Sequence, residues 1–237
     1  MSNKICLWSC PRNVSTALMY SFGQRPDMLV FDEPLYAHYL NMSGLDHPGR
    51  EFILASQENN GEKVISDIIL KEYEKSSFFK LMTHFLVGIN KDFLKNVQNI
   101  LFIRDPKEII FSYSKVIESP KMSDIGVRMQ YDLYKYLSHY DNPIVLDSKY
   151  LLQNPFKTLK KLCVLLGIPF YKEMLEWERG PKEEDGVWAK YWYDNVHDST
   201  SFLPYKKKDI HLTKDLESLY QECLPYYNFL TEKSIKT

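Results

Sequence analysis

The chain has 237 residues, enough for one α/β domain with a sizeable core. Its 30 basic and 31 acidic residues give a formal net charge of −1, so no global field recruits nucleic acid or an anionic membrane. Because no stretch resembles a membrane span or a signal peptide, we expect a soluble, cytoplasmic single domain over residues 1–237.

The cysteine pattern indicates neither a disulfide framework nor a metal centre. Cys6, Cys10, Cys163 and Cys223 form no CxxC pair, and their neighbours are apolar or loop-like rather than rich in histidine. We therefore expect four reduced thiols.

Residues 4–22 predict a strand, a polar loop and the N-terminus of a helix. Such a junction gathers unpaired backbone N–H groups and the positive end of a helix dipole, which favours an anionic ligand. Arg12, Asn13, Ser15 and Thr16 add side-chain donors at the same point. The alternative is that Ser15 is only a helix N-cap and that Arg12 is only a surface charge.

A second buried strand is predicted over residues 28–33, where Pro34 stops the apolar run. Asp32 and Glu33 then lie at the carboxyl end of a strand, on the edge where open α/β sheets carry their ligands. Glu33 is either a catalytic carboxylate or a structural one, and in the second case it is a solvated loop charge or a partner for Arg12.

Residues 36–77 have a less regular pattern and are expected to be an insertion or to form the substrate side of a site. A third strand is predicted over residues 78–85, which places Lys80 inside the strand and Thr83 and His84 at its carboxyl end. A histidine at the ligand-bearing edge favours a role in proton transfer.

A fourth strand is predicted over residues 99–103, and Arg104 follows it as a second fixed cation before a helix. Ser112 comes eight residues later, about two turns into that helix, where a serine has little local reason to occur. The alternatives are a tolerated helix serine, and a salt bridge from Arg104 to Asp105 or Asp32.

The later part of the chain alternates helices with one further strand. Helices are predicted over residues 122–140, 156–168 and 211–231, and a fifth strand over 144–147. Strands separated by helical segments predict a three-layer α/β/α fold with a mostly parallel five-stranded sheet.

Residues 180–208 are rich in aromatic and polar side chains and have no clear periodicity. A long irregular connection of this kind usually serves binding, so we interpret it as a cofactor or substrate lid. Trp188, Trp192 and Phe202 are candidates to cover a purine, and the lysines 206–208 are candidates to approach a phosphate.

The segments CPRNVSTAL and FIRDPKEIIFSYS together resemble the two cofactor signatures of sulfotransferases that use 3′-phosphoadenosine-5′-phosphosulfate (PAPS). The second match is the specific one, and the resemblance implies that Arg104 and Ser112 bind the 3′-phosphate. It also implies a P-loop-NTPase-like fold.

The first signature is usually P-[KR]-S-G-[ST]-[ST] in that family. The resemblance implies that Arg12, Ser15 and Thr16 bind the sulfonate-bearing phosphate, and Asn13 is a further candidate because its side chain is a donor in the same loop. The chain departs from the signature at Asn13 and Val14, where the family commonly has Ser and Gly.

The family's base is often the histidine of a K-T-H strand end, and THFL resembles this segment, which implies His84 as the base. The lysine position is taken by Met82, and Lys80 lies two residues earlier. In a bacterial branch a glutamate ends the second strand, which makes Glu33 the alternative base. Arg12 and Lys80 are expected to stabilise the transferring group.

The resemblance implies sulfuryl transfer from PAPS to a hydroxyl or amine of a small-molecule acceptor, leaving adenosine 3′,5′-bisphosphate and using no metal. We expect no nucleic-acid or membrane partner. The alternatives are a non-catalytic nucleotide-binding module of the same fold and, ranked third, a kinase, because this chain lacks the GK[ST] signature of P-loop kinases.

The chain also lacks the C-terminal R-K-G loop of the hormone-type enzymes. Residues 184–202 are similar to sulfotransferase-like proteins that include some with aminotransferase-like labels, but no Schiff-base lysine context supports that label.

Overall fold

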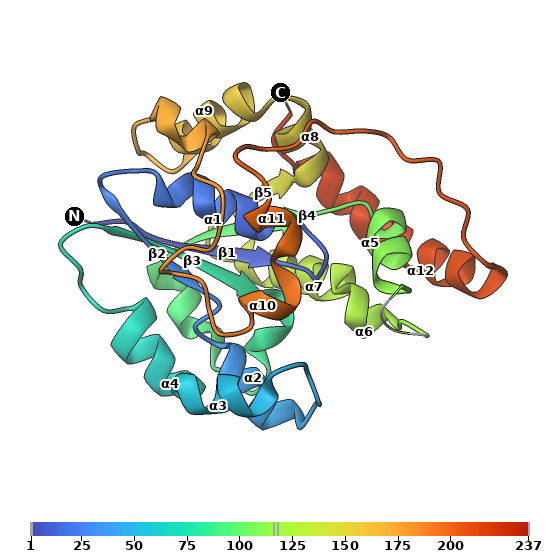
Figure 1. Cartoon of the computed structure of the whole chain (residues 1–237), viewed down its shortest axis with the longest axis horizontal. Coiled ribbons are helices and arrows are strands. Elements are labelled where there is room, and N and C mark those ends of the chain that lie inside the picture. Colours follow the sequence, from blue (N-terminus) through green and yellow to red (C-terminus); the bar gives the residue numbers. More distant parts are fainter. Residues whose placement is uncertain (1, 116, 118, 237) are drawn as a thin grey trace.

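Five apolar segments form one parallel β-sheet in the computed structural model, which describes residues 2–115, 117 and 119–236. The strands are β1 (Lys4–Ser9), β2 (Met28–Asp32), β3 (Ser76–Met82), β4 (Gln98–Ile103) and β5 (Ile144–Asp147). Their order in the sheet is β2-β3-β1-β4-β5, and every pairing is parallel. Helices lie on both sides of the sheet, which gives three layers (Figure 1).

The helices cover most of the rest of the described chain. They are α1 (Ser15–Gly23), α2 (Tyr36–Ser43), α3 (Arg50–Ser56), α4 (Gly61–Val64), α5 (Pro106–Tyr113), α6 (Met122–Ile125), α7 (Val127–Leu137), α8 (Ser148–Gln153), α9 (Pro155–Leu165), α10 (Ala189–Trp192), α11 (Asp194–His197) and α12 (Lys214–Lys233). A π-helix, η1 (Ile65–Ile69), continues α4, and the 3₁₀ helices are η2 (Thr83–Leu86), η3 (Lys91–Asn96) and η4 (Lys172–Leu175).

The central strand β1 separates two apolar cores because its side chains alternate between the faces of the sheet. Ile5 and Leu7 pack in the core that includes α1, α8 and α9. Cys6 and Trp8 pack in the core that includes α2, α3, α7 and α12. Since β1 pairs with β3 on one side and β4 on the other, its carboxyl end lies in the middle of the edge predicted to carry the site.

The predicted three-layer fold with a five-stranded sheet is confirmed, and the sheet is parallel throughout. The first and last residues of the predicted domain, 1 and 237, lie outside the described ranges. All four cysteines are free, as expected.

Several predicted boundaries differ from the structure by a few residues, and two of the differences have a clear structural cause. The third strand ends at Met82 rather than at residue 85, because the Thr83 hydroxyl donates to the Ser9 carbonyl at 3.0 Å and the chain turns into η2. The helix predicted over residues 122–140 is divided at Gly126, which has a φ of 78°. A Cβ atom at that position would lie 3.3 Å from the Cβ of Cys10, so the glycine also permits a close approach to the loop after β1.

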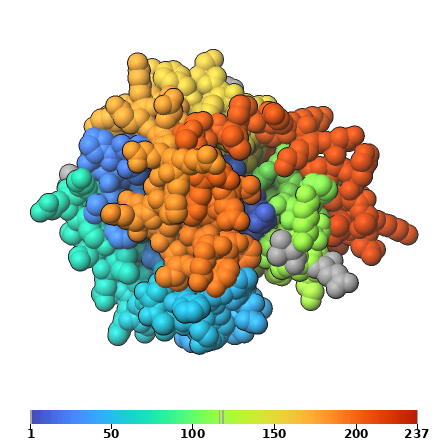
Figure 2. Space-filling model, viewed as in Figure 1, coloured from blue at the N-terminus to red at the C-terminus, as the bar shows by residue number. Residues whose placement is uncertain are grey.

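The segment 180–208 contains the short helices α10 and α11 and lies across the carboxyl edge of the sheet. In Figure 2 its orange atoms cover the centre of the face shown, between the cyan α2–α3 region and the yellow α8–α9 region. We call this segment the lid.

Candidate functional site

One cavity of about 880 Å³ opens at the carboxyl edge of the sheet, between the lid and the strand ends. It is the edge at which open α/β sheets bind ligands. Every site residue predicted from the sequence lines this cavity: Arg12, Asn13, Ser15, Thr16, Glu33, Lys80, His84, Arg104 and Ser112. We call the part with Arg12, Arg104 and Ser112 the anion end, and the part with Glu33, Lys80 and His84 the base end.

The N-terminus of α1 opens into the anion end without a side-chain cap. Val14 occupies the N-cap position and has no side-chain acceptor, and the first turn contains no acidic residue. Ser15 is the first residue of the helix rather than its cap, so that alternative reading does not describe this helix. Backbone N–H groups of the first turn are therefore left for a ligand, together with the positive end of the helix dipole.

The loop before α1 turns at Arg12 itself, whose φ of 57° is unusual for a residue other than glycine. Asn13 holds the turn in place, because its side-chain nitrogen donates to the Phe102 carbonyl at 2.9 Å and its oxygen accepts from the Val14 N–H at 2.9 Å. The loop thus reaches the helix without the glycine of the family signature.

Arg12 and Ser112 meet although they are a hundred residues apart, since the Nε of Arg12 donates to the Ser112 hydroxyl at 3.0 Å. The remaining N–H groups of the Arg12 guanidinium make no hydrogen bond within the described ranges. The Ser112 hydroxyl keeps its own proton to donate. Both side chains therefore retain donors that face the cavity.

Arg104 supports the same loop from β4. Its Nη1 donates to the Arg12 carbonyl at 2.5 Å, and its Nε and Nη2 donate to a Glu108 carboxylate oxygen at 3.0 and 2.5 Å. The salt-bridge partner is thus Glu108, not the Asp105 or Asp32 considered from the sequence. Asp105 instead caps α5, where it accepts from the Lys107 N–H at 2.8 Å. An arginine has five N–H donors, so two remain for an anion.

Lys80 lies at the centre of the base end, with only 1% of its side chain exposed. Its ammonium group contacts Asp32 at 2.8 Å and Glu33 at 2.7 Å, and it also donates to the Tyr193 hydroxyl. Glu33 therefore pairs with Lys80 and not with Arg12. An ammonium group has three N–H donors, and these three partners use all of them.

Glu33 has a backbone φ of 45° and a side chain that is 7% exposed. Burial raises the pKa of its carboxyl to about 7, although the charge of Lys80 acts in the opposite direction. Lys80 binds one oxygen, Oε1, and no hydrogen bond to Oε2 occurs in the part of the chain that the structure describes. A carboxylate of this kind can accept a proton near neutral pH.

His84 lies in η2 against aromatic rings, 4.6 Å from Tyr39 and 4.8 Å from Phe85 between ring centroids. Burial lowers the pKa of its imidazole to about 3. The ring makes no hydrogen bond within the described ranges, so no partner orients it for proton transfer.

The lid supplies residues at the base end that were not predicted from the sequence as site residues. The Tyr193 hydroxyl contacts both oxygens of Asp32, at 2.9 and 2.8 Å, and the Gly186 N–H donates to Asp32 at 3.1 Å. One sequence signal pointed to such partners: a lysine inside a buried strand requires counter-charges. That signal identifies Lys80 and the neighbouring carboxylates, but not Tyr193.

The predicted lid aromatics have different surroundings. Trp188 is 2% exposed and packs edge-on against Tyr36 at 5.2 Å, so it belongs mainly to the core under the lid. All three aromatic residues, Trp188, Trp192 and Phe202, line the cavity, and so does Lys208 among the three lysines considered from the sequence.

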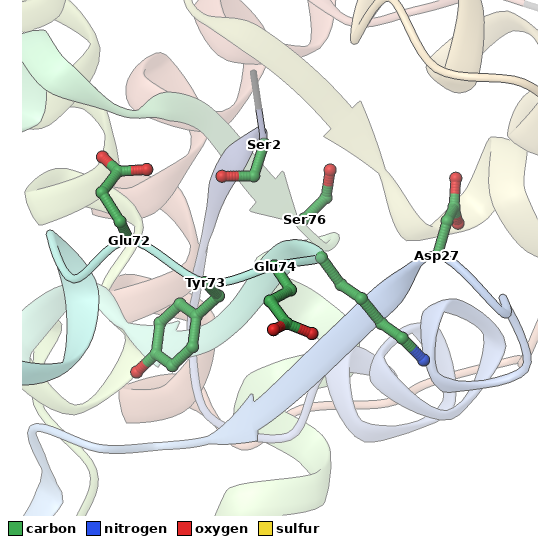
Figure 3. Close-up of a pocket in the computed structure, with 7 residues that line it drawn as sticks. Ser2, Asp27, Glu72, Tyr73, Glu74 and Ser76 are labelled. Atoms are coloured by element: carbon green, nitrogen blue, oxygen red, sulfur yellow. The ribbon is translucent and has the colours of Figure 1, made fainter.

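A second cavity, of about 560 Å³, lies at the amino edge of the sheet (Figure 3). It contains none of the predicted site residues and is lined by Ser2, Asp27, Glu72, Tyr73, Glu74, Lys75 and Ser76. We place the functional site at the carboxyl edge because the anion end and the buried ion pairs are both there.

The described ranges contain neither a metal-binding cluster nor a helix that could span a membrane. No group of three or more metal-ligating side chains is arranged to hold an ion there. Within the same ranges, none of the helices is both long enough and apolar enough to span a membrane.

Comparison with known proteins adds a family match and two groups of relatives. Residues 3–234 match the family model described as "Sulfotransferase domain". The chain is 39% identical over 228 residues to "Branched-chain-amino-acid aminotransferase-like protein 1" of Arabidopsis thaliana, and 38% identical over 226 residues to protein 2 of that name. These matches cover 94% of this chain but 40% of each relative, so the chain spans about two fifths of their length.

A solved structure with a similar fold is the sulfotransferase domain from the Synechococcus PCC 7002 olefin synthase. It has a TM-score of 0.56 and 14% sequence identity, and the match covers 94% of this chain and 95% of that chain. At this identity the likeness supports the fold.

Proposed function

The chain belongs to the sulfotransferase domain family, and we propose that it transfers a sulfuryl group from PAPS to a hydroxyl or amine of a small-molecule acceptor. The observation that supports the proposal is that the anion end and the base end lie in the same cavity. An uncapped helix N-terminus with Arg12 and Ser112 lies at one end, and Glu33 with a pKa raised to about 7 lies at the other.

The donor nucleotide would be held by its two separated anionic groups. The N-terminus of α1 and the free N–H groups of Arg12 suit the phosphosulfate, and Ser112 with the two free donors of Arg104 suits the 3′-phosphate. Arg104 also holds the Arg12 carbonyl, so one residue both binds an anion and fixes the loop that binds the other.

PAPS would supply the sulfuryl group on a good leaving group. Sulfuryl transfer is similar to phosphoryl transfer in having a loose transition state, so the protein contributes positioning and charge stabilisation. Arg12 and the N–H groups of α1 are the donors available for that charge. Lys80, whose three donors are all used by Asp32, Glu33 and Tyr193, acts instead on the base.

Glu33 is the base in this proposal, which reverses the order of preference drawn from the sequence. A base works best when its pKa is near the working pH, which fits a pKa of about 7 better than one of about 3. Glu33 is also oriented by Lys80, whereas His84 has no orienting partner within the described ranges. The Oε2 atom of Glu33 would take the proton of the acceptor.

A test of the donor site compares three nucleotides at matched concentration. We expect adenosine 3′,5′-bisphosphate to raise the melting temperature, and adenosine 5′-monophosphate and ATP to raise it much less, because two separated phosphate sites are available. Ser112→Ala should weaken binding of the bisphosphate by about 1 kcal/mol and weaken binding of the monophosphate by less, because Ser112 also accepts a hydrogen bond from Arg12. Equal stabilisation by all three nucleotides would contradict a 3′-phosphate site.

Turnover is tested with sulfur-labelled PAPS and a panel of phenols, alcohols and amines. Transfer of label to an acceptor, lost in Glu33→Gln while bisphosphate binding is kept, supports an enzyme. Tight binding of the bisphosphate with no transfer to any acceptor, and no slow hydrolysis of PAPS, would favour the alternative of a binding module. The aminotransferase-like names of the relatives gain no support from Lys80, because its two carboxylate partners outweigh burial and raise its pKa, keeping the amine protonated.

A further inference from the structure

Tyr193 is the one residue of the lid whose hydroxyl enters the buried charge cluster at the base end. The residue is 5% exposed, and its hydroxyl contacts Asp32, Lys80 and the indole N–H of Trp188, the last at 3.1 Å. A phenol has one proton, which it donates to the Asp32 carboxylate while it accepts from Lys80 and Trp188. Burial, followed by the charges of Asp32 and Glu33, raises the pKa of Tyr193, so this proton is retained.

The contact completes the surroundings of Lys80. Asp32 and Glu33 come from the end of β2, and Lys80 comes from β3, but the third acceptor comes from the lid, more than a hundred residues later. Because Lys80 is 1% exposed, water cannot readily replace a missing acceptor. Without the phenol, the ammonium group would shift toward its two remaining partners.

Other lid contacts occur at the same point. The Gly186 N–H donates to Asp32, and the Trp188 ring covers Gly186 so closely that a Cβ atom there would lie 2.1 Å from the ring. The lid is therefore fixed on Asp32 through both a backbone and a side-chain group. These contacts form only when the lid lies on the sheet.

We propose that Tyr193 is a positioning residue that couples closure of the lid to the ability of Glu33 to accept a proton. With the lid in place, the phenol accepts one of the three N–H groups of Lys80, so the ammonium group is shared between the phenol, Asp32 and Glu33 and does not turn wholly toward the two carboxylates. Glu33 then keeps a proton affinity suited to a base. This inference rests on the proposed function, in which Glu33 accepts the proton of the acceptor.

The test compares Tyr193→Phe with Tyr191→Phe, a matched control in the same helix region whose side chain is 39% exposed and does not line the cavity. Proteins are labelled with ¹³C at the glutamate carboxyl, and the Glu33 signal is identified by its loss in Glu33→Gln. In Tyr193→Phe we expect the pKa of Glu33 to fall by about 0.5 or more, because Lys80 directs more of its charge to Glu33. Tyr191→Phe should titrate as the wild type does.

The same variants are then assayed for transfer. Tyr193→Phe should lower kcat by about tenfold or more and shift the rise of the pH–rate profile to lower pH, with bisphosphate affinity within about twofold of wild type. An unchanged or raised pKa of Glu33, or equal losses of nucleotide affinity and kcat, would overturn the inference. If the wild type shows no transfer, the proposed function fails, but the Glu33 titration still decides the role of Tyr193.

A second variant covers the case in which Tyr193→Phe does not fold. Trp188→Phe keeps an aromatic ring in the core but removes the N–H that donates to the Tyr193 hydroxyl, together with part of the buried ring volume, so the phenol is held in place less firmly. It should shift the pKa of Glu33 in the same direction by a smaller amount. A titration identical to wild type in this variant would count against the proposal.

Discussion

Glu33 and His84 have surroundings that reverse the ordinary order of their pKa values. Burial raises the pKa of the Glu33 carboxyl to about 7 and lowers that of the His84 imidazole to about 3. A kinetic pKa near neutrality would ordinarily be assigned to a histidine. In this cavity the same observation points to the glutamate.

This reversal makes the choice of base testable by pH. With Glu33 as the base, kcat should rise with pH through about 7, because only the deprotonated carboxylate accepts the proton. Glu33→Gln should lower kcat by about 10²-fold or more and remove the rise, while His84→Ala should be mild. With His84 as the base, the rise would fall near pH 3, outside the usual assay range.

The imidazole can be followed directly as a control. Because the pKa of His84 is lowered to about 3, its ring proton signals should not titrate between about pH 5 and pH 8. A His84 titration centred near pH 6, together with full activity of Glu33→Gln, would return the role of base to the histidine.

At the scale of elements, the uncapped N-terminus of α1 makes the free protein less stable but leaves N–H groups that can bind an anion. Val14 at the N-cap leaves the first-turn N–H groups unpaired, although Asp or Asn at that position would satisfy them. An uncapped helix end costs stability, and its retention is understandable if a ligand anion completes it. The helix end thus links local structure to the proposed donor site.

Substitution of Val14 should therefore separate stability from function. Val14→Asp and Val14→Asn both supply a cap and should each stabilise the free protein by about 0.5–1 kcal/mol, less any loss from the packing of Val14. The aspartate also places a negative charge at the anion end, so it should weaken bisphosphate binding by about tenfold more than the asparagine does. Calorimetry and thermal melts measure both effects. Equal affinities for the two variants would show that no anion binds at this helix end.

Local sequence pattern was sufficient where an element is defined by its own residues. The strand β5 was predicted at its observed bounds, Ile144–Asp147, because a short apolar run lies between turn residues. The end of β3 was missed, because it depends on the contact between Thr83 and Ser9. The contact of Tyr193 with Lys80 joins residues 113 positions apart, and no local periodicity records it.

The site shows the same division. Arg12, Glu33, Arg104 and Ser112 could be named as candidates because each lies next to a predicted strand end or at a fixed spacing from one, and the structure places all of them in the lining of one cavity. Glu108 lies only four residues after Arg104, and this local partner was overlooked, whereas Tyr193 is brought to Lys80 by tertiary packing. At a sheet edge each charged residue has several possible partners, and the sequence alone does not distinguish between these ion pairs.

At the scale of the whole molecule, the net charge is only −1, but the charged residues are distributed unevenly along the cavity. Arg12, Arg104 and Lys208 line the cavity at or near the anion end. Asp46 and Asp124 line it near His47, where their charges oppose the lowering of the His47 pKa by burial. Since the pKa values of His47 and His84 are both lowered, both rings are neutral near pH 7. Away from the anion end, the positive charge of Lys80 is paired with Asp32 and Glu33, so the described lining carries a net negative charge from Asp46 and Asp124.

This asymmetry predicts the charge of a good acceptor. Tyr36, Tyr39 and Phe85 form an aromatic wall beside Glu33, against which a flat acceptor can pack. Tyramine and 3-(4-hydroxyphenyl)propionate present the same phenol with opposite charges, and 4-ethylphenol is the neutral reference. We expect kcat/KM to be about tenfold or more higher for the amine than for the carboxylate, since one unit charge a few ångströms from a carboxylate contributes roughly 1–4 kcal/mol.

Two controls identify the source of that preference. Asp124→Asn should lower the ratio of kcat/KM for tyramine to kcat/KM for the carboxylate, without changing kcat/KM for 4-ethylphenol. Added salt should also lower this ratio, but by less than it would if the charges were fully exposed. Burial raises the pKa of Tyr113, the charge of Asp124 raises it further, and the charge of Arg12 lowers it. The charges of Asp124 and Arg12 therefore both act on the same part of the cavity. If the carboxylate were the better substrate, the acceptor would have to bind with its charged end toward Arg12. The assignment of the anion end to the donor nucleotide would then have to be reversed.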